Sequence, residues 1–256
     1  MTEQPSFHYT RTEHENGPSF VWLHGWGQDL TSLNRLANLY HKKGSNTLFD
    51  LPGFGKSGLP PKGAGTPQYA DMLAEKLNAL NLPGPHIFIG HSFGGRLAVQ
   101  MAARHPQMTQ SIILLAGAGL KRKRPLAFKL RSTWLKMLGK LARFSDNLFK
   151  TSYRETYSQR YGSADYKAAG ELRPTFVKVV NEDLISEAQA TTCPALLIYA
   201  SQDNEAPPEI GQKYASLMPN AHFHELKGYG HLDILDRGAY QCQALIDAFL
   251  QEQVPS

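Results

Sequence analysis

A serine between two glycines stands where an apolar run passes into a helical pattern. Residues 87–89 are apolar, Gly90-His91-Ser92-Phe93-Gly94-Gly95 follows, and residues 96–104 continue with helical spacing. This strand–turn–helix junction is typical of a nucleophile elbow, in which the serine adopts a strained backbone conformation. Glycines on both sides leave the room that so tight a turn needs. The sequence therefore predicts that Ser92 is a nucleophile at a helix N-terminus, where developing negative charge is stabilised.

A nucleophilic serine needs a general base and an acid that orients this base. In proteins with such an elbow, the acid and then the histidine follow the serine along the chain. The apolar run 195–200 predicts a buried parallel strand, and Asp203 lies in the polar turn after it. Alternation over 221–226 predicts another strand, and the glycine-rich loop after it contains His231. A helical stretch over 238–251 comes next. We therefore predict Asp203 as the acid and His231 as the base.

Each of these residues also has an ordinary interpretation. Asp203 favours turns whether or not it is catalytic, Glu205 is a nearby competitor for the acid role, and His231 could be a plain loop histidine. The other histidines close to these elements are expected to be structural or solvent-facing: His91, His222 and His224. The joint order, with every group at the end of a strand, favours the combination of Ser92, Asp203 and His231.

The same chemistry needs an oxyanion hole. One donor should be the backbone N–H after the nucleophile, that of Phe93, and the other should come from an earlier strand-to-helix loop. The apolar strand predicted over 20–23 leads into His24-Gly25-Trp26-Gly27, in which the glycines let the main chain turn its amides inward. We therefore predict the Trp26 N–H as the second donor. The alternative is a tight turn without a catalytic role.

These motifs together resemble those of the serine α/β-hydrolases. They are His24-Gly25-Trp26-Gly27, the segment from Asp50 to Ser57, Gly90-His91-Ser92-Phe93-Gly94-Gly95, Asp203 and Gly230-His231. The resemblance covers the chain from about Phe20 to its end, apart from a variable central stretch. It implies an α/β fold with an eight-stranded, mostly parallel central sheet flanked by helices. Because there is room for only one strand before Phe20, we expect the first strand or hairpin to be reduced. The Asp50 segment looks like a structural loop of this family, and no chemistry is assigned to it.

Several activities are disfavoured. Family relatives that dehalogenate alkanes or open epoxides use an aspartate where this chain has Ser92. The sequence has no His-Glu-x-x-His pattern and no cysteine cluster, so no metal is expected. It also lacks Gly-x-Gly-x-x-Gly and a phosphate-binding loop, so no cofactor is expected. No recognition motif for nucleic acid accompanies the positive charge.

The basic residues gather in the middle of the chain. Residues 121–178 hold 15 of the 27 Lys and Arg but only four acidic residues. This is where the family inserts a helical cap, so we expect a core domain over 1–118 and 191–256 and a helical cap over 119–190. Apolar residues at helical spacing support the cap: Leu126, Leu130, Trp134, Leu135, Leu138 and Leu141. The expected walls of the substrate site are Trp26, Phe93, Trp134 and Leu232.

Three interpretations of the basic residues remain open. They could form a solvated cap surface, or a basic amphipathic helix that rests on an anionic membrane and collects lipid substrates. They could also dock an acidic partner or an anionic substrate. The basic cap and His24-Gly25-Trp26-Gly27 resemble the pimeloyl–acyl carrier protein methyl ester esterases, whose partner is acidic. The nucleophile motif of that family often differs from Gly-His-Ser-Phe-Gly.

The resemblance implies a serine hydrolase that cleaves small-molecule carboxylic esters with short- to medium-chain acyl groups. Three alternatives use the same three residues: carbon–carbon bond hydrolysis of vinylogous diketones, carrier-protein methyl ester hydrolysis and cofactor-free perhydrolysis. A non-enzymatic, hydrolase-like binding protein is a further alternative. The acyl-chain preference and the oligomeric state are not predicted.

The expected compartment is the cytoplasm. The first 17 residues are polar and lack the apolar core of a signal peptide. Cys193 and Cys242 are expected to be free thiols in a reducing environment. No apolar run is long enough to span a bilayer.

Overall fold

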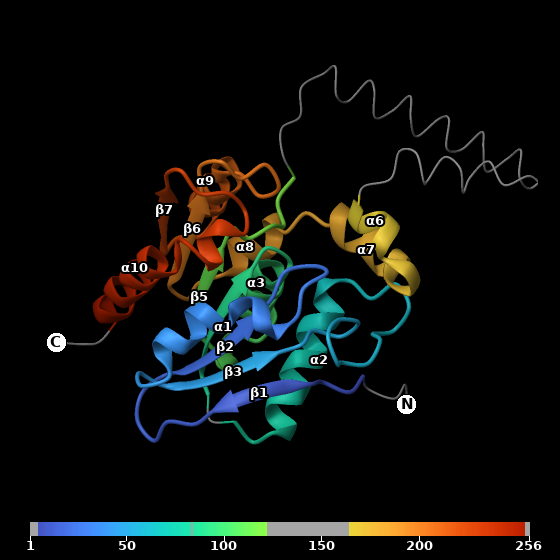
Figure 1. Ribbon diagram of the computed structural model, residues 1–256, viewed down its shortest axis with the longest axis horizontal. Helices are drawn as coiled ribbons and strands as arrows, with labels where there is room; N and C mark the ends of the chain where they lie inside the picture. The colour runs from blue at the N-terminus through green and yellow to red at the C-terminus, as the bar shows by residue number, and fades with distance from the viewer. Residues whose placement is uncertain (1–4, 83, 122–163, 254–256) are drawn as a thin grey trace, which may run out of the picture.

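A seven-stranded sheet forms the centre of the computed structural model (Figure 1), which describes residues 5–82, 84–121 and 164–253. The strands are β1 (Tyr9–Thr12), β2 (Ser19–Leu23), β3 (Ser45–Phe49), β4 (His86–His91), β5 (Thr109–Leu115), β6 (Ala195–Ala200) and β7 (Ala221–Leu226). Their order across the sheet is β1-β3-β2-β4-β5-β6-β7. Every neighbouring pair is parallel except β1 and β3.

The sheet confirms the fold class expected from the sequence. Within the described residues, it has one strand fewer than the eight that the resemblance implies, which agrees with the reduced start expected before Phe20. The strands predicted over 20–23, 87–89, 195–200 and 221–226 are present as β2, β4, β6 and β7. Because these strands run parallel, their carboxyl ends meet at one edge of the sheet, where such folds place their sites.

Burial explains the different sequence patterns of the strands. Every residue of β4 and of β6 is buried, and both read as apolar runs, as expected for a parallel strand covered on both faces. β7 is the outermost strand on one side of the sheet, and its residues alternate between partly buried and exposed. The exposed positions of β7 include His222 and His224, in agreement with their expected solvent-facing role.

The described residues also form helices around this sheet. They are α1 (Asn34–Ala37), α2 (Thr66–Ala79), α3 (Phe93–Arg104), α6 (Ala164–Ala168), α7 (Arg173–Asn181), α8 (Ile185–Ala190), α9 (Pro208–Leu217) and α10 (Ala239–Glu252). The short 3-10 turns are η1 (Leu30–Leu33), η2 (Asn38–Tyr40), η3 (Pro106–Met108), η4 (Gly170–Leu172) and η5 (Asp233–Leu235). Contacts join α2, α3, α8 and α9 in one series, and α1 with α10 in a second group. None of the described helices is both long and apolar enough to cross a membrane.

The expected cap falls partly outside the described residues. Trp134, the leucines at helical spacing and most of the basic residues lie between positions 122 and 163. The described part of 119–190 is largely helical, with α6 and α7 beside each other and α8 against α3 (Figure 1). Glu182 anchors this part to the core, because its carboxylate accepts from Thr66 N at 2.9 Å and from Thr66 Oγ1 at 2.7 Å at the start of α2. The division into core and cap stays a prediction.

Candidate active site

Ser92 occupies a strained turn between β4 and α3. Its φ is +49° and its ψ −105°, a combination that non-glycine residues rarely adopt. A Cβ on Gly90 would lie 2.2 Å from the carbonyl oxygen of Gly94, and one on Gly94 would lie 2.0 Å from that of Leu23. The flanking glycines are therefore required by the close approach of the backbone. The Ser92 N–H donates to the Leu115 carbonyl at 3.1 Å, which fixes the turn to β5.

Asp203 and His231 meet at the same edge of the sheet. Asp203 lies in the turn after β6, and His231 in the loop after β7. The Nδ1 of His231 is 2.6 Å from the Oδ2 of Asp203, and the two side chains are 9% and 0% exposed. The other carboxylate oxygen, Oδ1, accepts from the backbone N–H groups of Glu205 at 2.7 Å and Ala206 at 2.9 Å. This arrangement holds the imidazole with Nδ1 on the carboxylate and Nε2 directed away from it.

The electrostatics of Asp203 favour its ionised form. Burial alone would raise the pKa of Asp203, but the hydrogen bond and the charge of His231 lower it, and the two backbone N–H groups lower it further. The resulting pKa lies below the ordinary value. A carboxylate with several donors in a buried turn remains charged at neutral pH. It can therefore fix the tautomer of the imidazole and stabilise an imidazolium.

Glu205 approaches the other side of the same imidazole. Its Oε2 lies 3.5 Å from His231 Nε2, and its side chain is 71% exposed. The two carboxylates that competed for the acid role in the sequence therefore occupy different positions. Asp203 contacts Nδ1 from within the core, and Glu205 faces Nε2 from the solvent side.

His91 links the nucleophile turn to the loop of His231. Its ring lies 4.7 Å from the His231 ring between centroids, and its Nε2 is 3.1 Å from the His231 carbonyl oxygen. Its Nδ1 lies 3.3 Å from Gln28 Oε1, so both ring nitrogens of His91 face oxygen acceptors. Burial, together with the nearby His231, lowers the pKa of His91 to about 3. His91 is thus a buried neutral histidine with a structural contact, in agreement with its expected role.

The loop after β2 brings a second backbone amide toward the elbow. His24 holds this loop, since its Nδ1 donates to the Gly25 carbonyl at 2.7 Å while its Nε2 accepts from Leu51 N at 2.9 Å. Gly27 has a φ of +72°. In the part of the chain that the structure describes, the N–H groups of Trp26 and Phe93 have no protein acceptor. Both are therefore available to a bound oxygen, as an oxyanion hole requires.

Aromatic rings surround Trp26. Its indole ring lies 5.4 Å from Phe93, 4.9 Å from Phe54 and 5.1 Å from Phe176 between centroids. Phe176 belongs to α7 and was not predicted as a site residue, because nothing in its short stretch of sequence indicates which element it packs against. Leu232, next to His231, is 56% exposed. Of the four expected wall residues, Trp134 lies outside the described residues.

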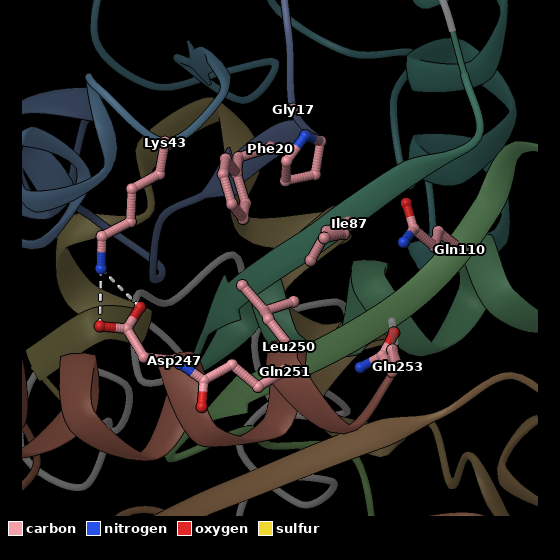
Figure 2. A pocket seen from close by; sticks show the side chains of 10 residues that line it. Gly17, Phe20, Lys43, Ile87, Gln110, Asp247, Leu250, Gln251 and Gln253 are labelled. Atoms are coloured by element: carbon pink, nitrogen blue, oxygen red, sulfur yellow. Dashed lines mark hydrogen bonds and ion pairs between the residues drawn. The ribbon is translucent and has the colours of Figure 1, made fainter. Parts of the chain in front are cut away.

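The candidate site is distinct from a cavity of about 580 Å³ at the opposite edge of the sheet. This cavity lies among the residues before β2, the starts of β2, β4 and β5, and α10, and Figure 2 shows Lys43 bound to Asp247 at its rim. None of the candidate catalytic residues lines it. Among the described residues, no group of three or more His, Cys, Asp or Glu side chains is placed to hold a metal ion.

Comparison with known proteins agrees with this fold. Residues 18–238 match the sequence model of a protein family that is described as having the α/β-hydrolase fold. A pimeloyl-[acyl-carrier protein] methyl ester esterase from Chromobacterium violaceum is 28% identical, over 86% of this chain and 89% of the relative. A bacterial membrane phospholipase A superposes with a TM-score of 0.74 at 21% identity, over 96% of this chain and 83% of that one. The enol-lactonase of Burkholderia xenovorans LB400 gives 0.71 at 21% identity, over 96% of both chains.

Proposed function

Because this chain belongs to the α/β-hydrolase fold family, we propose that it hydrolyses carboxylic esters through an acyl-enzyme on Ser92, with His231 as the base and Asp203 as the orienting acid. The observation that carries the proposal is the contact of 2.6 Å between His231 Nδ1 and the buried Asp203 carboxylate, with the His231 ring 4.7 Å from the ring of His91, the residue before Ser92. The sequence relatives with 26–28% identity are named as methyl ester esterases, and the chemistry of this arrangement is acyl transfer.

The reaction uses two steps with the same residues. Ser92 Oγ attacks the ester carbonyl carbon while His231 Nε2 takes the hydroxyl proton, and this proton then leaves with the alcohol. Water attacks the acyl-enzyme, with His231 again as the base, and releases the carboxylic acid. Asp203 stabilises the imidazolium in both steps. The N–H groups of Trp26 and Phe93 donate to the oxyanion, an interaction worth about 3 kcal/mol per donor in other hydrolases.

The acyl group lies against the aromatic rings in this proposal. Trp26 and Phe93 provide both the donors and part of the apolar wall, and Phe176 extends this wall from α7. We also propose Leu232, next to His231, as part of this wall; the expected contribution of Trp134 lies outside the described residues. Such surroundings favour a small-molecule ester with a short- to medium-chain acyl group. The two cysteines of the chain are free, which agrees with the proposed cytoplasmic location.

A methyl ester on an acidic carrier protein is the second candidate substrate. The relatives with 26–28% identity are named for such a substrate, pimeloyl-[acyl-carrier protein] methyl ester. In this chain, residues 121–178 carry 15 basic and four acidic residues, a charge that would attract an acidic partner. An anionic membrane surface would be attracted by the same charge. The choice among these substrates depends on residues 122–163, which also carry Trp134.

The test is a series of p-nitrophenyl esters from acetate to palmitate, with a carrier-protein methyl ester and a vinylogous diketone alongside. We expect the wild type to hydrolyse the short and medium esters and Ser92→Ala to lose this activity by about 10⁴-fold or more. Thermal unfolding of both proteins controls for folding. A folded Ser92→Ala protein that keeps the activity would refute the proposal. If the diketone is turned over far faster than every ester, the assigned activity becomes carbon–carbon bond hydrolysis. Slow turnover of all substrates together with tight binding would indicate a binding protein.

A further inference from the structure

We infer that Glu205 is a positioning residue that sets the pH range over which His231 works as a base. This inference rests on the proposed function, because it assigns a role toward the same imidazole. Glu205 Oε2 lies 3.5 Å from His231 Nε2, the nitrogen that exchanges the proton with Ser92. The nitrogen on the other side of the ring is already bound to Asp203. The imidazole therefore lies between two carboxylates, of which the mechanism so far uses one.

The side chain of Glu205 has no structural task that explains this position. It is 71% exposed and makes no other hydrogen bond or ion pair within the described residues. Its backbone N–H, by contrast, donates to Asp203 Oδ1 at 2.7 Å and so helps to build the turn. A substitution that changes only the carboxylate leaves this backbone contact in place. The two contributions of Glu205 can thus be separated by mutation.

The direction of the effect follows from the charges around the ring. When His231 is neutral and its proton is on Nδ1, the lone pair of Nε2 faces the negative carboxylate. When Nε2 gains a proton, the same contact becomes attractive. Glu205 therefore stabilises the imidazolium that forms as Ser92 attacks.

The remaining groups around His231 do not supply the same charge at Nε2. Asp203 acts at Nδ1, and His91 is buried and neutral, with its pKa lowered to about 3 by burial. On the loop of His231 itself, Asp233 accepts from Gly230 N at 2.8 Å and is paired with Arg237 at 3.0 Å. Glu205 is thus the charged group of the described residues that faces Nε2.

The experiment compares kcat/KM against pH for the wild type, Glu205→Gln and Glu209→Gln, with the best p-nitrophenyl ester as substrate. Glu209 is an exposed residue in the first turn of α9. Glu209→Gln therefore removes one negative charge, as Glu205→Gln does, but at a position without a contact to His231. In Glu205→Gln we expect the acid limb to move to lower pH by about 0.5 unit, the size of an exposed ion pair. The rate at the alkaline plateau should fall by about two- to threefold, because the base is weaker.

Ionic strength provides a second readout. Added salt screens an exposed pair, so it should move the acid limb of the wild type to lower pH and leave that of Glu205→Gln nearly unchanged. Glu205→Asp, which keeps the charge on a shorter side chain, should fall between the two. A Glu205→Gln profile that superimposes on that of Glu209→Gln, or moves to higher pH, overturns the inference. If Ser92→Ala is inactive in the same assay, the proposed function survives that result and only the role of Glu205 is lost.

Discussion

Asp203 and Glu205 are two positions apart in the sequence but have opposite environments in the fold. Asp203 is fully buried and receives two backbone N–H groups and the imidazole, whereas Glu205 projects into solvent. A buried carboxylate with three donors has one fixed orientation, and an exposed one is screened by water and salt. Position along the chain alone could not separate these roles. The separation depends on how the turn after β6 directs each side chain.

Replacing the buried Asp203 carboxylate by an amide should disable His231 as a base. In Asp203→Asn the amide can donate to His231 Nδ1, which places the ring proton on Nε2, and this tautomer cannot take the proton of Ser92. We expect kcat to fall by about 10⁴-fold with little change in KM. Steady-state kinetics on the best ester measures this effect.

The matched control for Asp203→Asn is Asp236→Asn, which removes an exposed carboxylate paired with Arg35. This control should keep the wild-type rate. An Asp203→Asn protein that stays within tenfold of the wild type would show that His231 is oriented by another group.

Residue types and spacing predicted Ser92, Asp203 and His231 because each follows a strand whose pattern is readable. The contact of Trp26 with Phe176 could not be predicted in this way. Phe176 is more than 100 residues from Trp26 in sequence, on a short helix whose packing partner is not encoded in its periodicity. The approach of Glu205 to Nε2 also depends on side-chain direction, which spacing does not report.

At the scale of elements, a buried carboxylate joins the loops beside the site. Asp50 follows β3, and its Oδ1 accepts from Leu30 N at 2.8 Å while its Oδ2 accepts from Lys56 N at 2.8 Å. Its Oδ2 also lies 2.7 Å from His8 Nδ1. These contacts support the structural role that the sequence resemblance implied. The next residue, Leu51, donates to His24, so this turn also supports the loop of Trp26.

Asp50 should therefore contribute to stability with a defined pH dependence. Burial would raise the pKa of Asp50, but the hydrogen bonds from Leu30, Lys56 and His8 lower it below the ordinary value. The stabilisation is present above the pKa of the unfolded chain, about 3.9, and is lost as the pH falls through the lower folded value. We expect Asp50→Asn to destabilise the fold by about 2 kcal/mol at pH 7, since an amide offers one acceptor fewer. The difference from wild type should shrink below about pH 4.

Urea unfolding at several pH values measures the free energy of unfolding of Asp50→Asn and the wild type, with Asp71→Asn as the control. Asp71 is a partly exposed carboxylate paired with Arg104 at 2.6 Å and His105 at 3.0 Å. Its loss should cost less than about 1 kcal/mol, as is usual for surface pairs. Equal destabilisation by the two substitutions, or a loss in Asp50→Asn that persists at low pH, would contradict the role assigned to Asp50.

At the scale of the whole molecule, the sheet explains why residues far apart in the sequence lie at the same end of its strands. β4, β6 and β7 are parallel and lie within four adjacent strands, so the loops that follow them emerge at one edge. Ser92, Asp203 and His231 follow these three strands. Continuous apolar runs predicted the buried strands, because both faces of a parallel sheet are covered. The antiparallel pairing of β1 with β3 was not predicted, since a four-residue edge strand has little pattern of its own.

Charge is also organised over the whole chain. Residues 121–178 are strongly basic, while the rest of the chain carries 12 basic and 18 acidic residues. An uneven distribution of this kind acts over a Debye length of about 8 Å at physiological salt. It bears on which partner or substrate approaches the site, and the chemistry at Ser92 does not depend on it.

The most direct test of the central claim is to locate the nucleophile chemically. A fluorophosphonate ester reacts with an activated serine, and tandem mass spectrometry of the digested protein identifies the modified residue. We expect one label per chain on Ser92, with loss of ester hydrolysis in proportion to labelling, and no label in Ser92→Ala. A label on another residue, or full ester hydrolysis in protein labelled at Ser92, would contradict the assignment of Ser92 as the nucleophile.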